Sequence, residues 1–175
     1  MNKVELLDDC NNSLGEGITY SSSNNNLYWL DIGNVSKLYS LDLSSNKKEI
    51  FELPEIVTAT SIKSQNELIL ATTNGLKLFN TSNKKFESVV NIENQQSLTR
   101  SNDGASDALG RFWFGTMQNN FDKNGNSIPL KENIGKLYKV DTNKKISVVE
   151  EGLGIPNTFV WSPDNCLLYT SDAAD

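Results

Sequence analysis

The chain contains no histidine among its 175 residues. Histidine is the most frequent general base near neutral pH and the most frequent zinc ligand in proteins. Its absence excludes mechanisms of the Ser-His-Asp and Cys-His types. Any acid–base chemistry must therefore use a carboxylate, lysine, tyrosine or cysteine side chain.

Cysteine and long apolar runs are also scarce. The two cysteines, Cys10 and Cys166, lie far apart and outside any C-x-x-C motif, which argues against a disulfide framework or a thiolate metal site. No apolar run approaches the length of a transmembrane helix, and residues 1–12 lack the apolar segment of a signal peptide. We therefore expect a cytoplasmic protein that does not contact membranes.

Positive charge is the third shortage. Lysine and arginine total 16 against 22 acidic residues, which gives a net charge of -6. Because nucleic-acid-binding proteins usually carry a clustered basic surface, we expect no nucleic-acid partner. The acidic excess is compatible with a bound cation, and the 37% hydrophobic content suffices for the packed core of one domain.

Short apolar segments recur along the chain and predict an all-β fold. Each is bounded by Gly, Asn, Asp or Ser, as is typical of strands, and no segment shows helical periodicity of sufficient length. The predicted strands are residues 27–32, 37–43, 67–71, 75–79, 86–91, 111–115, 136–141 and 146–149.

Some of these strands are near copies of one another. Residues 37–42 read KLYSLD and residues 136–141 read KLYKVD, and an Asn-Lys-Lys turn follows them at 46–48 and 143–145. The same turn, at 83–85, follows the related strand at 75–79. A repeat of about 40–45 residues with four strands is typical of a β-propeller blade. A β-sandwich is the alternative, but the matched units favour the propeller. We expect the lysines of these turns to be solvent-exposed, and residues 118–133 to be an inserted loop.

The segment from Thr99 to Met117 is the richest in candidate site residues. Arg100 can clamp a carboxylate or polarise a carbonyl, and Asn102 can offer its amide oxygen to a cation. Asp103 and Gly104 form a common turn pair, which we expect just before an aromatic strand at 111–116. The aromatic side chains of that strand are expected in the core.

Two further polar residues stand in similar settings. Glu16 lies between Gly15 and Gly17, and glycines allow the backbone to approach a crowded centre closely; a plain surface turn is the alternative. Asn157 precedes an apolar strand, as Asn102 does. Residues 162–165 form a turn to which we assign no chemistry.

Five motifs in order resemble the SMP-30/gluconolactonase/regucalcin family. They are GEG at 15–17, LYWLDI at 27–32, RSNDG at 100–104, GRFWFGTM at 110–117 and IPNTFVWSPD at 155–164. The resemblance implies a six-bladed β-propeller, which needs roughly 240–270 residues. We therefore expect residues 1–175 to form a single, C-terminally truncated propeller domain of about four blades or fewer.

The resemblance also implies a function, that of a metal-dependent hydrolase of sugar lactones. Glu16 and Asn157 match the family's metal ligands, and Arg100 and Asn102 match its substrate-binding positions. The cofactor is one divalent metal, with calcium favoured over zinc, magnesium and manganese, and the partner is a small-molecule sugar lactone. The family's further ligand and general base, an Asp in a later blade, lies beyond the chain end.

The truncated chain is accordingly expected to be inactive alone, with no catalytic residue of its own. The alternative function is a non-catalytic β-propeller that binds a metal or a partner.

The last ten residues, 166–175, back-translate into a transposase adaptor used in sequencing libraries. We therefore expect a non-native tail there. The alternative is that residues 167–172 are the family's next strand. Neither interpretation gives Cys166 or Asp172 a role in a site.

Overall fold

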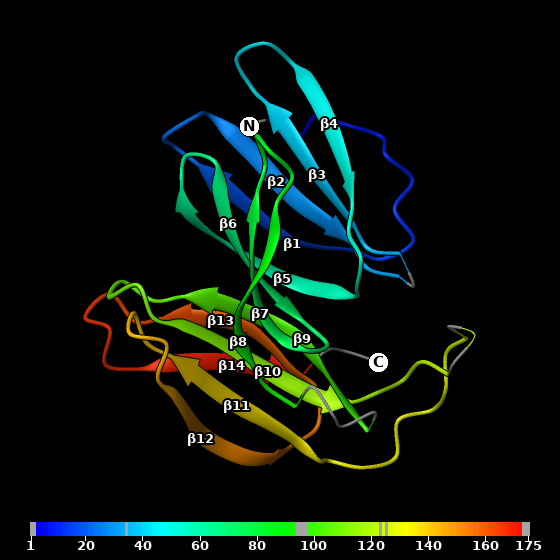
Figure 1. Cartoon of the computed structure of the whole chain (residues 1–175), viewed down its shortest axis with the longest axis vertical. Helices are drawn as coiled ribbons and strands as arrows, with labels where there is room; N and C mark the ends of the chain where they lie inside the picture. Colours follow the sequence, from blue (N-terminus) through cyan, green and yellow to red (C-terminus); the bar gives the residue numbers. More distant parts are fainter. Residues whose placement is uncertain (1–2, 34, 94–97, 123, 125, 173–175) are drawn as a thin grey trace.

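The computed structural model describes residues 3–33, 35–93, 98–122, 124 and 126–172, and every element named in it is a strand (Figure 1). The first seven are β1 (Gly15–Ser21), β2 (Asn26–Asp31), β3 (Lys37–Asp42), β4 (Lys47–Glu52), β5 (Val57–Ser64), β6 (Glu67–Thr72) and β7 (Gly75–Asn80). The others are β8 (Phe86–Asn91), β9 (Thr99–Ser106), β10 (Phe112–Gln118), β11 (Gly135–Val140), β12 (Ile146–Leu153), β13 (Pro156–Trp161) and β14 (Leu168–Asp172). Within the described residues, no helix is long and apolar enough to span a membrane.

The strands form three four-stranded antiparallel sheets and one pair. Strands β1–β4, β5–β8 and β9–β12 each pair in sequence order, and β13 pairs with β14. We call these sheets blades 1 to 3 and the pair the half blade. The first strands of the sheets, β1, β5, β9 and β13, pack against one another as inner strands. This confirms the all-β propeller predicted from the repeat.

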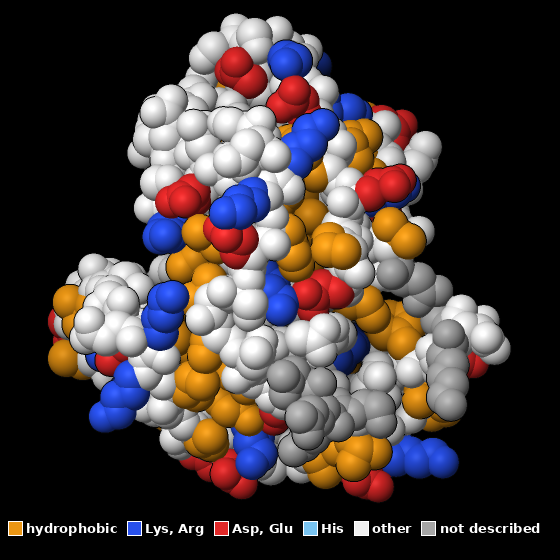
Figure 2. All heavy atoms as spheres, in the orientation of Figure 1, with side chains coloured by type: hydrophobic (Ala, Val, Ile, Leu, Met, Phe, Trp, Pro, Cys, Tyr) orange, Lys and Arg blue, Asp and Glu red, His pale blue; other side chains and the backbone are white. Residues whose placement is uncertain are grey.

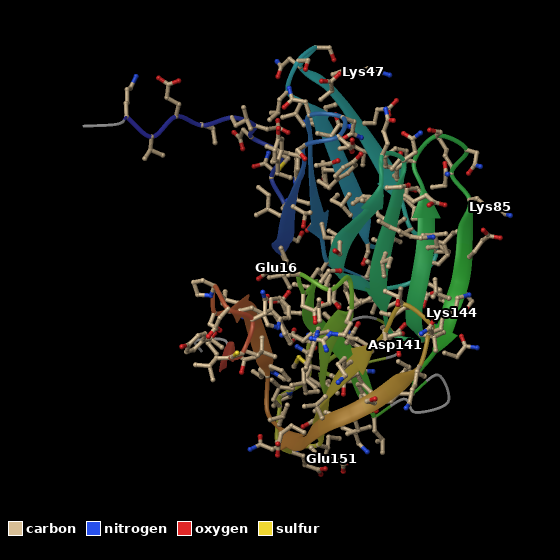
Figure 3. All side chains as sticks on the ribbon, turned by 90° about the vertical axis from the view of Figure 1, so that its left-hand side faces the viewer. Glu16, Lys47, Lys85, Asp141, Lys144 and Glu151 are labelled. Atoms are coloured by element: carbon tan, nitrogen blue, oxygen red, sulfur yellow. The ribbon has the colours of Figure 1, made fainter. Side chains whose placement is uncertain are left out.

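The repeated turns occupy the same place in each blade. All three join the third strand to the fourth, and one residue in each has a positive φ: Asn46, Lys84 and Lys144. A side-chain oxygen at the end of the third strand accepts backbone N–H groups of the turn; these acceptors are Asp42, Asn80 and Asp141. Lys47 and Lys85 lie at the outer edge of the molecule (Figure 3), with 71% and 63% of their side chains exposed.

The core fills the spaces between blades. One cluster joins blades 1 and 2 and includes Leu30, Leu38, Leu68 and Phe79. A second joins blades 2 and 3, where Phe114 stacks on Tyr138 with ring centroids 5.3 Å apart. Burying each large side chain contributes roughly 1.5–3 kcal/mol. The prediction that the 111–116 aromatics serve the core is confirmed for Phe112 and Phe114, which are 2% and 1% exposed.

The surface seen in Figure 2 mixes charges of both signs. Acidic and basic side chains are interspersed on this face, and apolar side chains show between them.

The prediction that Asp103, Gly104 and Asn157 precede strands is wrong. Asp103 and Gly104 do not form a turn ahead of a strand, because both lie within β9. Asn157 likewise lies within β13. Both strands contain an irregular pairing at these residues, and this irregularity hides the strand from a simple alternation of apolar and polar residues.

Residues 168–172 form β14, which pairs antiparallel with β13. This pairing is what the next-strand interpretation requires. The adaptor origin of residues 166–175 is a statement about DNA and stays a prediction, which the genomic sequence across the Asn165 codon would test.

Candidate functional site

A cavity of about 180 Å³ lies where the inner strands of all three blades and the half blade meet. It brings together the four residues predicted from sequence, Glu16, Arg100, Asn102 and Asn157. The polar lining is completed by Thr58, Asp103 and Asn120, and the apolar lining by Leu14, Ile32, Met117, Leu130 and Ile155.

Bulges on three inner strands set the direction of these side chains. In β1, Gly17 and Ile18 together face one partner residue; in β9, Asn102 and Asp103 do so; and in β13, Thr158 and Phe159 do so. A bulge bends its strand and re-aims the neighbouring side chains. Glu16 and Asn157 are the paired residues immediately before their bulges, so they occupy equivalent positions.

Arg100 is a buried cation held in place from several sides. It is 5% exposed, and its Nε donates to Asn120 Oδ1 at 2.8 Å. Its Nη1 donates to the Ser101 carbonyl at 2.7 Å and to Asn102 Oδ1 at 3.4 Å. Burial lowers the pKa of Arg100 to about 10, so it remains protonated at neutral pH. Among the described residues, Nη2 has no hydrogen-bond acceptor, so these donors are available to a ligand.

The two bulge residues of β9 reach across to β13. Asn102 Nδ2 donates to the Pro156 carbonyl at 3.0 Å. Asp103 Oδ2 accepts the Thr158 N–H at 2.8 Å, and its Oδ1 accepts the Gly104 N–H at 2.7 Å. Burial raises the pKa of the Asp103 carboxyl, and the two N–H donors act in the opposite direction. Asp103 thus connects two inner strands, a role that the sequence did not indicate.

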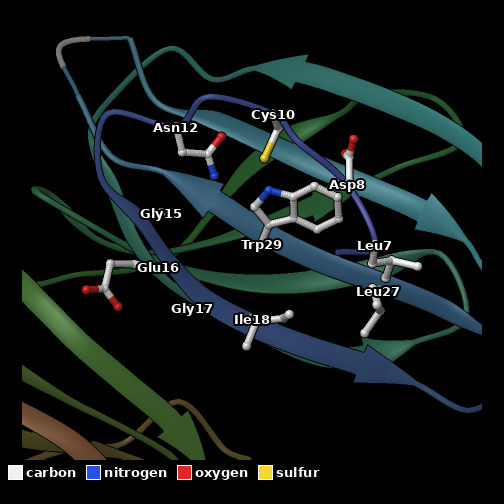
Figure 4. A pocket seen from close by; sticks show the side chains of 10 residues that line it. All are labelled: Leu7, Asp8, Cys10, Asn12, Gly15, Glu16, Gly17, Ile18, Leu27 and Trp29. Carbon is white, nitrogen blue, oxygen red and sulfur yellow. The ribbon is translucent and has the colours of Figure 1, made fainter. Parts of the chain in front are cut away.

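Glu16 and Asn157 are free by comparison. Glu16 is exposed and Asn157 is half-buried, and neither side chain has a hydrogen bond or ion pair to any other described residue. A second cavity, of about 380 Å³, lies along blade 1 and is lined largely by apolar side chains such as Leu27 and Trp29. In Figure 4 the Glu16 carboxylate points away from Trp29.

The side-chain oxygens of Glu16 and Asn157 suit a hard cation. Carboxylate and amide oxygens are the ligands that calcium, magnesium and manganese prefer, and the oxygens of Glu16 and Asn157 have no other partner among the described residues. No group of three or more His, Cys, Asp or Glu side chains able to hold a metal occurs in the described part of the chain. A cation here would therefore depend on amide oxygens as well as on Glu16.

Two lining residues were missed by sequence reasoning. Asn120 lies in the long loop after β10 and orients Arg100; its place directly after a strand of the motif region was the available signal. Thr58 of β5 donates to Ser101 Oγ at 2.8 Å and ties blade 2 to blade 3. Nothing in the sequence marks it, because threonine is ordinary in strands.

Comparison with known proteins gives a consistent picture. The sequence model of the family described as SMP-30/Gluconolactonase/LRE-like region matches residues 14–175. A 6-deoxy-6-sulfogluconolactonase of Pseudomonas putida is 30% identical over 91% of this chain and 51% of its own length. A putative sugar lactone lactonase of Rhizobium meliloti is 26% identical over 95% of this chain and 52% of its own.

The structural comparison agrees. The crystal structure of a calcium-binding protein, regucalcin, from Agrobacterium tumefaciens superposes with a TM-score of 0.83 at 28% identity. The match covers 95% of this chain and 52% of that one. The chain therefore spans about half the length of the relatives it matches.

Proposed function

The chain belongs to the SMP-30/gluconolactonase/LRE-like family, and on that premise we propose that it supplies the metal- and substrate-binding half of a sugar lactone hydrolase. The observation that carries the proposal is the convergence of Glu16, Arg100, Asn102 and Asn157 on one cavity. Relatives that are named as lactonases support the substrate class.

In this proposal Glu16 and Asn157 hold one divalent cation, with Asn102 beside them. Calcium is the first choice, because the donors are oxygens and a similar structure is that of a calcium-binding protein. Such a metal, when bound, supplies a Lewis acid that polarises a carbonyl and lowers the pKa of a bound water.

Arg100 has the second role. Its buried guanidinium is fixed by Asn120 and by the Ser101 carbonyl, and it directs its remaining donors at the oxygen atoms of the substrate. Because the Arg100 guanidinium is already fixed before the substrate arrives, little reorganisation of this side chain is needed on binding. Asp103 is not proposed as the general base, since both of its oxygens accept backbone N–H groups.

Hydrolysis of glucono-δ-lactone, with calcium and with a chelator, tests the proposal. It should be measured for the 175-residue chain and for the genomic reading frame that contains it. We expect the genomic product to turn over lactone, and we expect both Glu16→Ala and chelator to abolish turnover. Activity that survived both treatments would contradict the proposal.

The same assay separates the alternative function. A genomic product that binds calcium but leaves every lactone intact would support a non-catalytic binding propeller. In that case Arg100→Ala would leave metal affinity unchanged.

A further inference from the structure

The bulges of β1 and β13 have the same geometry but different residues. The residue after Glu16 is Gly17, with φ 63°, and the residue after Asn157 is Thr158, with φ 59°. Glycine adopts such a left-handed conformation readily, whereas for a β-branched residue it is a costly outlier. The β13 bulge therefore needs support that the β1 bulge does not.

That support comes from β9, on both sides of Asn157. Asp103 Oδ2 accepts the N–H of Thr158, and Asn102 Nδ2 donates to the carbonyl of Pro156. The Thr158 side chain itself is exposed, so packing around it does not explain its conformation. The two hydrogen bonds fix the backbone immediately before and after Asn157.

We infer that Asp103 is a positioning residue that holds Asn157 toward the axial cavity by fixing the backbone of Thr158. This rests on the proposed function, in which Asn157 is a metal ligand. Asp103 does not touch the cation or the substrate; it acts through the strand that carries the ligand. An outer-shell partner of this kind typically contributes 10–100-fold to metal affinity, to order of magnitude.

The substitution Asp103→Asn tests the inference. An amide replaces one carboxylate oxygen with an NH₂ donor and removes the negative charge, so the Gly104 and Thr158 N–H groups no longer each have a charged oxygen acceptor of their own. We expect amide hydrogen exchange at position 158 to become faster, while exchange at Gly17, in the equivalent bulge, stays unchanged. We also expect Mn²⁺ affinity, measured by relaxation of water protons, to fall by about tenfold or more.

A second substitution, Thr158→Gly, separates positioning from general stability. Glycine takes the left-handed conformation without help, so Thr158→Gly in the Asp103→Asn background should restore most of the Mn²⁺ affinity. The matched control is Asp107→Asn. Asp107 is likewise a largely buried carboxylate with both oxygens in use: Oδ1 accepts the N–H groups of Leu109 and Arg111, and Oδ2 accepts the side-chain N–H groups of Arg111 and Trp113, but the residue lies outside the cavity lining. The Asp107→Asn substitution should leave Mn²⁺ affinity unchanged.

Each outcome decides the inference. Unchanged exchange at position 158 in Asp103→Asn would overturn it, as would an Mn²⁺ loss that Thr158→Gly fails to rescue or that Asp107→Asn reproduces. If the unaltered chain binds no Mn²⁺, the proposed metal site fails, but exchange at position 158 relative to Gly17 still decides whether Asp103 fixes this backbone.

Discussion

The two walls of the axial cavity differ in how firmly they are held. On β9, Arg100 is 5% exposed and bonded to Asn120 and Ser101, and Asp103 is bonded to two backbone N–H groups. On β1, Glu16 is exposed, and its side chain has no hydrogen-bond partner among the described residues. One wall is part of the folded framework, whereas the other offers a free carboxylate.

Because of this difference, substitutions on the two walls should affect the stability of the fold and ligand binding differently. A substitution on the β9 wall leaves buried groups unpaired, so it should lower the free energy of unfolding together with the affinity for any ligand that the substituted residue contacts or positions. A substitution of Glu16 removes no intramolecular contact of this kind. It should change binding alone.

The largest effect is expected for Arg100→Ala. It removes the donors to Asn120 and to the Ser101 carbonyl and leaves a cavity where the guanidinium lay against the Phe121 ring. The free energy of unfolding should fall by roughly 2–4 kcal/mol, as measured by urea denaturation. A change as small as that of an ordinary surface substitution would show that Arg100 does not hold this wall.

The next effect concerns Asp107, which lies just beyond β9 and away from the cavity. Burial alone would raise the pKa of Asp107, but hydrogen bonds from Trp113 and Arg111 outweigh it and hold the pKa below its usual value. A lowered carboxyl pKa stabilises the fold above the unfolded-state value of about 3.9 and loses this contribution as the pH falls through the folded-state value.

Asp107→Asn should therefore destabilise the chain by roughly 1.5–3 kcal/mol at neutral pH and flatten the fall in stability below about pH 4. Denaturation across that range measures both. An acid profile identical to that of the unaltered chain would rule out Asp107 as a source of acid sensitivity. Asp107→Asn should leave ligand affinity unchanged, so it shows the effect of lost stability without a change at the cavity.

A smaller effect is expected where β10 packs against β13 of the half blade. A Cβ at Gly115 would lie 2.4 Å from Cβ of Pro156, so Gly115→Ala must push β13 away. The cost should be about 1–3 kcal/mol by denaturation, with weaker binding of any ligand held by Asn157. Gly33→Ala is the control, since its nearest contact would be 3.9 Å away. Equal effects of the two substitutions would contradict the packing of β13 against β10.

Most middle and outer strands were predictable from the sequence, although β4 was missed, and most inner strands were not. Residues 37–42 and 136–141 were recognisable because they share the pattern KLYxxD, and both belong to third strands of blades. Strands β1, β5 and β9 are rich in Gly, Ser and Thr and have irregular pairings, so no regular period marks them. Residues of these three strands line the cavity, and departures from local regularity are common at functional sites.

The candidate site was predictable only as an ordered set of motifs. Glu16 and Asn157 lie far apart in sequence, and only the propeller topology brings them to one cavity. The contacts of Asp103 and Asn120 depend on tertiary structure, so no local pattern reveals them.

The central claim is that the Glu16 carboxylate is unpaired within the described structure and binds a cation. Thermal unfolding of the chain and of Glu16→Gln, each with a chelator and with excess calcium, tests it most directly. In chelator the two should agree within about 0.5 kcal/mol. Calcium at a hundred times its dissociation constant should stabilise the unaltered chain by about 2.7 kcal/mol and Glu16→Gln far less. Equal calcium stabilisation of both proteins would contradict the account.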